Sequence, residues 1–276
     1  MPASPLLTVM INAARKASRA IRRDFGEVES LQVSQKGPAN FVTRSDQRAE
    51  QTIREELLKA RPQWSFLMEE SGRTKGVDDS HCWIVDPIDG TTNFIHGIPH
   101  FAISIALLRA NELVAGVIYN PITDELFAAE RGRGAYLNDR RMRVAARRDL
   151  QDAVIACGIP HLGRGDHARF RRELAHLQAK SAGIRRFGAA ALDLAFVAAG
   201  RFDGYWERGL KAWDIAAGIV ILREAGGMAG DIDGAADVLA TGDIMAANSE
   251  LYPQIAQELA AAKRAGEPDE TAEMRS

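Results

Sequence analysis

The sequence contains little cysteine and no long uninterrupted hydrophobic run. Two cysteines, Cys82 and Cys157, occur in 276 residues, and each lies in an apolar stretch, where a small buried residue is expected. Such low cysteine use is typical of a reducing compartment. No apolar run reaches the length of a membrane span. Residues 1–12 have no basic segment ahead of an apolar one, so we expect no secretory signal and a cytoplasmic protein.

The sequence also lacks an excess of either charge. Its formal net charge is -2, which gives no indication of a nucleic-acid or membrane partner. The basic run at residues 139–148 contains no aromatic side chain on which a base could stack, so we expect a solvated edge there. With 46% hydrophobic and 26% charged residues, the chain has the composition of a globular protein with an ample core.

The spacing of apolar residues predicts alternating helices and strands. No linker or internal repeat divides the chain, so we expect one domain over residues 1–265, made of two packed α/β halves. We expect a polar, disordered tail over residues 266–276. The segment 72–80 is polar and is expected to form a mobile loop. Strands are expected at residues 64–68, 83–85, 98–109, 113–119, 126–129, 154–156, 184–187, 204–207, 227–232 and 244–247, and helices at 6–25, 45–61, 166–177, 188–199, 212–225 and 250–263.

The central stretch runs from Trp83 to Asn93 and reads WIVDPIDGTTN. Its first three residues predict the end of a buried strand, and Asp86 follows at once. Pro87 cannot donate to a sheet ladder, and Asp89-Gly90 favours a turn. Two carboxylates held this close repel each other and raise each other's pKa unless a cation compensates.

Two interpretations of this stretch are open from the residues alone. The first is an ordinary Asp-Gly turn that Asp86 caps. The second is a site for a hard divalent cation, which prefers carboxylate and carbonyl oxygens such as those of Asp86, Asp89 and the Ile88 backbone. Gly90 would let a ligand approach the backbone closely, and the amides of Gly90 and Thr91 could meet phosphate oxygens.

The complete string resembles the signature of the inositol monophosphatase family, W-[IV]-[IV]-D-P-[IL]-D-G-T-x-N-F. The resemblance extends over roughly residues 5–262 in four segments that follow the order of the family. It implies a layered α-β-α-β-α sandwich of the inositol monophosphatase and fructose-1,6-bisphosphatase superfamily. It further implies Mg²⁺, two or three ions per site, together with lithium sensitivity and homodimers.

Two segments before the centre contribute to the resemblance. Asp46, in the first turn of a helix, has a local explanation as a residue that favours the helix dipole, but the resemblance implies a hydrogen bond to the Thr91 hydroxyl. Lys36 is expected near the phosphate. Glu69 belongs to a Glu-Glu-Ser element that ends a strand, and the resemblance makes it a metal ligand.

Two segments after the centre complete it. Asp214, near a helix start, resembles the aspartate of the second family signature, which completes the inner metal site. Glu207 matches a carboxylate that binds a substrate hydroxyl. Gly188 and Ala190 belong to a segment that contacts substrate hydroxyls, although Ala189 replaces the usual hydroxyl residue.

The resemblance therefore implies three sets of residues. The metal ligands are Glu69, Asp86, Ile88, Asp89 and Asp214. The substrate-binding residues are Lys36, Asp89, Gly90, Thr91, Gly188, Ala190, Glu207 and Asp214. The catalytic residues are Glu69, Thr91 and Asp46, which position and deprotonate a water molecule.

The expected function is hydrolysis of a phosphate monoester, inositol 1-phosphate, by metal-activated water. Fructose 1,6-bisphosphate and other sugar, nucleotide or histidinol phosphates are alternative substrates within the superfamily. An alternative of another class is a non-catalytic partner of the transcription and RNA-processing machinery, as for some bacterial relatives. The retained carboxylates favour an enzyme acting on a small phosphomonoester, without a nucleic-acid or membrane partner.

Overall fold

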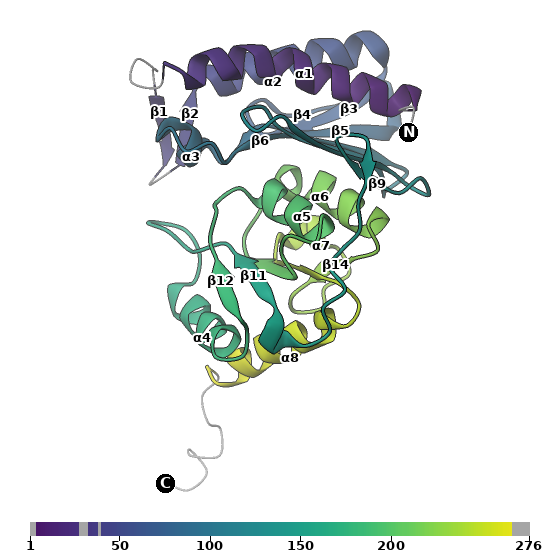
Figure 1. The fold of residues 1–276 in the computed structure, drawn as a ribbon. Helices are drawn as coiled ribbons and strands as arrows, with labels where there is room; N and C mark the ends of the chain where they lie inside the picture. The colour runs from purple at the N-terminus through teal and green to yellow at the C-terminus, as the bar shows by residue number, and fades with distance from the viewer. Residues whose placement is uncertain (1–3, 28–32, 38–39, 267–276) are drawn as a thin grey trace, which may run out of the picture.

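The computed structural model describes residues 4–27, 33–37 and 40–266. These residues form five stacked layers in which helices and sheets alternate (Figure 1). Helices α1 and α2 make the first layer and an eight-stranded sheet the second. Helices α5 and α6 make the third, a five-stranded sheet the fourth, and α4 with α8 the fifth. The α-β-α-β-α sandwich expected from the sequence is confirmed.

The helices differ in length with their place in the stack. Four of the five longest described helices lie in the two outer layers, and α3 and α7 are short connecting turns. The bounds are α1 (Pro5–Phe25), α2 (Arg44–Ala60), α3 (Thr91–Ile95), α4 (His167–Gln178), α5 (Ala190–Ala198), α6 (Ala212–Glu224), α7 (Val238–Thr241) and α8 (Leu251–Arg264), with a 3₁₀ turn at Leu150–Asp152.

The large sheet follows the spatial order β10-β9-β8-β7-β6-β5-β3-β4. All its neighbouring strands are antiparallel except β3 and β5, which are parallel. Its strands are β3 (Trp64–Met68), β4 (Gly72–Thr74), β5 (Asp78–Asp89), β6 (Ala102–Arg109), β7 (Glu112–Asn120), β8 (Glu125–Glu130), β9 (Ala135–Leu137) and β10 (Arg140–Arg141).

The smaller sheet has the order β12-β11-β13-β15-β14. Strand β11 pairs in parallel with both of its neighbours, and the remaining pairs are antiparallel. Its strands are β11 (Val154–Cys157), β12 (Gly183–Arg185), β13 (Gly204–Glu207), β14 (Met228–Asp231) and β15 (Ile244–Ala247), and a separate hairpin joins β1 (Val33–Gly37) to β2 (Asn40–Thr43).

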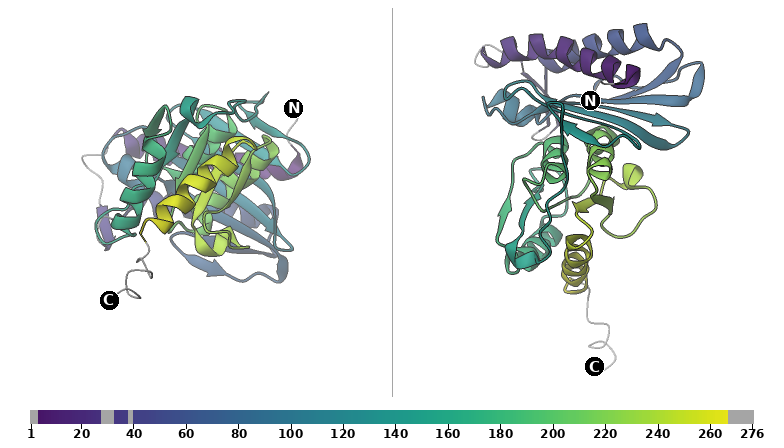
Figure 2. Two further views of the ribbon diagram at one scale, coloured as in Figure 1. Left: turned by 90° about the horizontal axis from the view of Figure 1, so that it is seen from below. Right: turned by 45° about the vertical axis from the view of Figure 1, so that its right-hand side comes forward.

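The character of each helix follows from the layer that it occupies. Helix α1 buries one face, which includes Met10, Ala14 and Ile21, against the large sheet and leaves basic residues on the other face. Helix α6 is enclosed between the two sheets, so its residues from Ile215 to Leu222 are buried on all sides. A helix that is apolar all round requires such a position. Figure 2 shows from another direction that α1 and α2 cover only the outer face of the large sheet.

The strands predicted at residues 98–109 and 113–119 correspond to β6 and β7, which form a hairpin with a two-residue turn. Strands β6 and β7 are joined by Ala110 and Asn111, whose φ angles are 49° and 63°. Two left-handed residues in succession give the turn whose twist matches the two strands that it connects.

The loop expected at residues 72–80 is wrong. Residues 72–74 form β4 at the sheet edge, and β5 already begins at Asp78. The β4 side chains of Arg73 and Thr74 are exposed, so the strand is polar and shows no apolar alternation. Short, polar edge strands protect a sheet against pairing with other chains. In the described residues, no helix combines the length and hydrophobicity needed to cross a bilayer.

Gly116 on β7 provides a test of the packing between the large sheet and α6. A β-carbon added at this residue would lie 2.6 Å from the Ala217 carbonyl oxygen of α6. We expect Gly116→Ala to lower the free energy of unfolding by about 1–3 kcal/mol, because overpacking displaces the helix. Urea unfolding measures this change. Gly26→Ala is the control, since its nearest neighbour is 3.4 Å away and its φ is -72°; an equal loss in both variants would contradict the account.

Candidate active site

Three carboxylates from separate parts of the chain meet at one point. Asp86, Asp89 and Asp214 each offer a carboxylate oxygen, and these oxygens lie within 4.8 Å of one another. Asp86 and Asp89 are 2% and 8% exposed. Glu69 lines the same cavity, which has a volume of about 380 Å³. The structure therefore brings together the four acidic residues that the sequence predicts as metal ligands.

Sheet topology explains why residues so distant in sequence converge. Strand β3 pairs in parallel with β5, with Met68 opposite Val85. The carboxyl ends of two adjacent parallel strands lie at the same edge, so Glu69 and Asp86 are neighbours. The β5–β6 register is irregular between Asp86 and Asp89, and this bulge turns both carboxylates toward the cavity. Asp214 arrives from the first turn of α6.

Strand β5 is longer than predicted, and the predicted turn at Gly90 follows its last residue. Strand β5 continues through Pro87 to Asp89, beyond the predicted strand end at Val85. Pro87 is tolerated because it falls in the irregular stretch of the ladder. Gly90 has a φ of 93°, and a β-carbon there would lie 3.2 Å from the Ala189 β-carbon and the His100 carbonyl oxygen. A glycine is needed both for the backbone angle and for this close contact.

Burial and mutual repulsion shift the titration of these groups. Burial, followed by the negative charges of Glu69, Asp89 and Asp214, raises the pKa of Asp86 well above its usual range. Burial and the Asp214 charge raise the pKa of Asp89, although the Ala191 amide donates to Asp89 Oδ2 at 2.7 Å. Burial likewise raises the pKa of Asp214, against a 2.7 Å hydrogen bond from the Lys211 amide.

The donor set fits a hard divalent cation. Every donor is an oxygen atom, the carboxylates are buried, and their repulsion is the electrostatic condition that a cation relieves. Asp86 Oδ1 accepts from the Ile88 amide at 2.9 Å, and Asp214 Oδ2 is bound by the Lys211 amide. These hydrogen bonds hold one oxygen of each carboxylate in place, as groups around a metal site do for its ligands.

Asp46 contacts the central motif as predicted. The Thr91 hydroxyl lies 3.3 Å from Asp46 Oδ1 and 3.0 Å from the Ile88 carbonyl oxygen, and its single proton is donated to one of them at a time. Asp46 Oδ2 accepts from the Thr43 amide and hydroxyl at 2.8 and 2.6 Å. The residue therefore both caps α2 and reaches the site, so its two interpretations are compatible.

Glu50 is a positioning residue that sequence reasoning missed. It is 5% exposed on α2, and its carboxylate accepts from the backbone amides of Glu70 and Ser71 at 2.8 and 2.9 Å. These bonds tie the turn after β3 to α2, and Glu69 is the first residue of that turn. A glutamate within a helical pattern gives no indication that it accepts hydrogen bonds from a turn distant in sequence.

Glu207 lines the same cavity, at the end of β13. Tyr205 donates its hydroxyl to Glu207 Oε2 at 2.6 Å. Gly158 faces the same carboxyl group, and a β-carbon there would lie 1.8 Å from Glu207 Cδ. Burial raises the pKa of Glu207, and the Tyr205 hydrogen bond opposes that shift. Tyr205 and Gly158 hold Glu207 in place. Tyr205 and Glu207 share one face of β13, whereas the Gly158 contact joins residues that are distant in sequence.

The segment before α5 forms another wall of the cavity through Gly188 and Ala190. It is fixed to the central motif by Asn93, whose side-chain amide donates to the carbonyl oxygens of His100 and Phe187 at 2.7 and 2.8 Å. The buried methyl of Ala189 packs against Gly90. The predicted residues Gly90, Thr91, Gly188, Ala190 and Glu207 thus all line one cavity. Lys36 falls in β1, and its side chain lies outside the described part of the chain.

Asp193 on α5 is a further acidic residue that the sequence analysis did not single out. Its side chain is fully buried, and in the described residues its carboxylate oxygens have no hydrogen-bond partner. Burial, and then the charges of Glu207 and Asp89, raise its pKa well above the usual range. The protonated form is therefore favoured, which avoids the cost of burying another charge.

Comparisons with known proteins show to which family this chain belongs. The sequence pattern described as the inositol monophosphatase family matches residues 3–265. The chain belongs to the inositol monophosphatase family. The predicted family is thereby confirmed, and the chain is a phosphatase, as the sequence indicated.

The relatives include proteins with two kinds of name. An "Inositol-1-monophosphatase" of Rhizobium meliloti (strain 1021) is 59% identical over 91% of this chain and 94% of its own. A "Nus factor SuhB" of Escherichia coli (strain K12) is 42% identical over 90% of this chain and 92% of its own. The crystal structure of the "extragenic suppressor protein suhB" from Bartonella henselae has a TM-score of 0.90 at 55% identity and covers 93% of this chain and 98% of its own.

The Cys157 thiol and the His100 imidazole are poorly suited to act as nucleophiles in this inositol monophosphatase fold. Burial, and then the charge of Glu207, raise the pKa of the Cys157 thiol to about 12, so it stays protonated at neutral pH. His100 packs against the Phe187 and Phe196 rings at centroid distances of 5.0 and 5.6 Å. These ring contacts give His100 a structural role in the core.

His100 provides a pH test of this packing. Burial lowers its pKa from 6.5 to about 4, so the unfolded chain takes up a proton below pH 6.5 while the folded chain does not. The contribution of neutral His100 to the free energy of unfolding is therefore fully present above pH 6.5 and is lost as the pH falls toward 4. At pH 5 this loss amounts to about 2 kcal/mol. Urea unfolding of wild type and His100→Gln at pH 7.5 and 5 checks it; an unchanged pH dependence in the variant would contradict the assignment.

Proposed function

We propose that this chain hydrolyses inositol 1-phosphate to inositol and phosphate in a Mg²⁺-dependent reaction. The observation that carries the proposal is the convergence of Glu69, Asp86, Asp89 and Asp214 on one cavity. Mutually repelling carboxylates gathered in a phosphatase indicate a site for cations that also bind phosphate. Glu207 and the Gly188 segment on the other walls leave room for a polyol.

We assign the metal sites to the acidic residues and to one backbone oxygen. Glu69, Asp86 and the Ile88 carbonyl would hold one ion, and Asp86, Asp89 and Asp214 a second, with two or three ions in all. Bound Mg²⁺ would lower the pKa of a water molecule and neutralise charge on the phosphoryl oxygens. The hydrogen bonds to Asp86 and Asp214 keep these side chains oriented before any ion arrives.

The residues around the phosphate would then position water and accept its proton. Glu69 would accept the proton as the water oxygen attacks phosphorus opposite the leaving inositol oxygen. The bond from phosphorus to that oxygen breaks, and the oxygen takes up a proton from solvent water to give inositol. The Thr91 hydroxyl orients the water, and Asp46 and the Ile88 carbonyl orient Thr91. The amides of Gly90 and Thr91, with Lys36, stabilise charge on the phosphoryl oxygens.

The substrate assignment rests on the polyol side of the cavity. Glu207, held by Tyr205 and Gly158, accepts a hydrogen bond from an inositol hydroxyl. Gly188 and Ala190 supply backbone contacts, and Ala189 offers no hydroxyl of its own. Fructose 1,6-bisphosphate and related phosphomonoesters are the competing substrates. A homodimer and a cytoplasmic location complete the proposal, on the strength of the family resemblance and of the low cysteine content.

Metal removal tests the mechanism most simply. Purified protein is expected to release phosphate from inositol 1-phosphate in the presence of Mg²⁺ and to lose that activity in EDTA, because the carboxylates alone cannot neutralise the phosphoryl oxygens. Added Mg²⁺ in excess of the chelator should restore the rate. Hydrolysis that continues in EDTA would rule out the mechanism, and a panel of phosphomonoesters ranks the substrates.

Asp89→Asn tests the assignment of the metal ligands. Asn keeps an oxygen to accept from the Ala191 amide, so the fold is expected to survive. The lost charge should lower kcat by about a hundredfold or more, the order found when charge stabilisation in a transition state is removed. Phosphate release and circular dichroism measure the two effects. A near-normal rate would show that the site is assigned wrongly.

A second candidate function is a binding role, and the relatives named Nus factor SuhB favour it. The experiment that separates the two functions is complementation of a deletion strain with the inactive Asp89→Asn variant. Complementation, together with recovery of RNA polymerase factors by pull-down, would favour the binding role. Failure to complement would favour the enzyme.

A further inference from the structure

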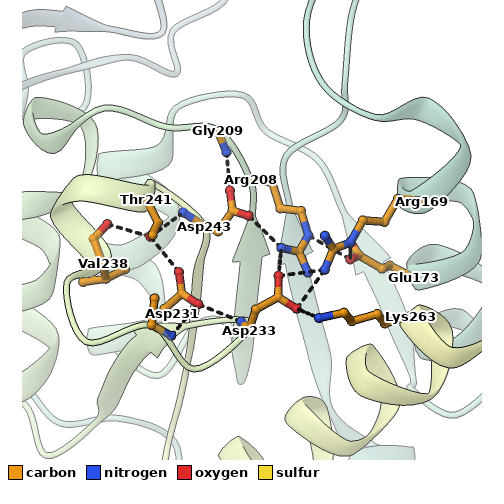
Figure 3. A network of polar contacts seen from close by, with 11 residues as sticks. Arg169, Glu173, Arg208, Gly209, Asp231, Asp233, Val238, Thr241, Asp243 and Lys263 are labelled. Atoms are coloured by element: carbon orange, nitrogen blue, oxygen red, sulfur yellow. Dashed lines mark hydrogen bonds and ion pairs between the residues drawn. The ribbon is translucent and has the colours of Figure 1, made fainter. Parts of the chain in front are cut away.

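Arg208 forms the centre of a charge network next to Glu207. Its guanidinium contacts three carboxylates, Glu173 at 2.8 Å, Asp233 at 2.9 Å and Asp243 at 2.7 Å (Figure 3). These carboxylates come from α4, from the loop after β14 and from the residue before β15. The Arg208 side chain is only 17% exposed, and Glu173 is 1% exposed. One side chain thus joins three elements that are distant in sequence.

The same network holds the backbone on both sides of Gly209. The Gly209 amide donates to Asp243 Oδ1 at 2.8 Å, and its carbonyl oxygen accepts from the Arg164 guanidinium at 2.7 Å. The Leu210 amide donates to the Gly242 carbonyl oxygen at 3.0 Å. Gly242 permits this approach, since a β-carbon there would lie 1.9 Å from the Leu210 carbonyl oxygen. Residues 208–210 are therefore tied down along their whole length.

This segment connects two functional residues. Glu207 ends β13 immediately before it, and Asp214 lies in the first turn of α6 shortly after it. Asp214 has an independent anchor, because α6 is buried between the sheets. Tyr205 and Gly158 fix the Glu207 carboxylate from one side, and the tied residues 208–210 follow its backbone directly. Hydrogen-bonded ion pairs fix position more specifically than apolar contacts, which have no preferred direction.

We propose that Arg208 is a positioning residue that sets the placement of Glu207 and thereby determines how well the cavity recognises the hydroxyl groups of a polyol phosphate. The inference rests on the proposed function, in which Glu207 accepts a substrate hydroxyl. It assigns to the network a role in substrate choice and none in cleavage of the phosphate ester. Substrates without hydroxyl groups are therefore insensitive to it.

Arg169 offers a matched control for this inference. Its guanidinium binds two of the three carboxylates that Arg208 contacts, Glu173 at 3.1 Å and Asp233 at 2.8 Å. The Arg169 side chain is 23% exposed. It lies on α4, however, and has no bond to Asp243 and no place next to Glu207 in the described structure. Loss of Arg169 weakens the same charge network without releasing residues 208–210.

The experiment compares Arg208→Met and Arg169→Met on inositol 1-phosphate and on p-nitrophenyl phosphate, a monoester without hydroxyl groups. Arg208→Met is expected to raise KM for inositol 1-phosphate about tenfold, which corresponds to one lost hydrogen bond, with kcat and the p-nitrophenyl phosphate kinetics within twofold of wild type. Arg169→Met should leave both substrates within twofold. Asp243→Ala, which releases both Arg208 and the Gly209 amide, should reproduce the effect of Arg208→Met. If Arg208→Met does not fold, Asp243→Ala tests the inference in its place.

The inference is overturned if Arg208→Met and Arg169→Met behave alike, or if both substrates lose activity in parallel with the melting temperature. Wild type that hydrolyses inositol 1-phosphate while the variants are unaffected would contradict this inference alone. Wild type that cleaves p-nitrophenyl phosphate but not inositol 1-phosphate would contradict the proposed substrate and, with it, the role of Arg208.

Discussion

The repulsion among buried carboxylates is the constraint on which this structure depends. Carboxylate oxygens of Asp86, Asp89 and Asp214 lie within 4.8 Å of one another, where the carboxyl end of β5 meets the start of α6. A folded chain without a functional reason would not hold three acidic groups there, because each one raises the energy of the others. The architecture supplies what makes the arrangement tolerable, namely amides that fix the carboxylates and a cavity in which cations fit.

Several layers of the fold contribute residues to the cavity and to the contacts that support it. Helix α2 supplies Asp46 to the Thr91 hydroxyl and Glu50 to the turn that carries Glu69. Helix α5 supplies the Ala191 amide to Asp89, and α6 supplies Asp214. The smaller sheet brings Glu207 to the cavity. Because the walls come from several layers, the packing between layers determines the dimensions of the cavity.

The sequence predicted the chemistry of the site better than the contacts that support it. The acidic residues proposed as metal ligands lie in motifs whose carboxylates themselves indicate a cation site, and the hairpin at residues 110–111 follows from the two β-rich runs that flank it. Residues 72–80 were misread because a polar edge strand has no alternation. Glu50, Gly158 and Arg208 were missed because each acts on a partner distant in sequence, and no local pattern indicates such a pairing.

The most direct test of the central claim is the thermal stability of wild type and Asp86→Asn, measured with EDTA and with Mg²⁺. Asn keeps the oxygen that accepts from the Ile88 amide but removes one of the repelling charges. The account predicts that Asp86→Asn melts at a higher temperature than wild type in EDTA, and that Mg²⁺ stabilises wild type much more than the variant. A variant that is less stable in EDTA, or a wild type that does not respond to Mg²⁺, would contradict it.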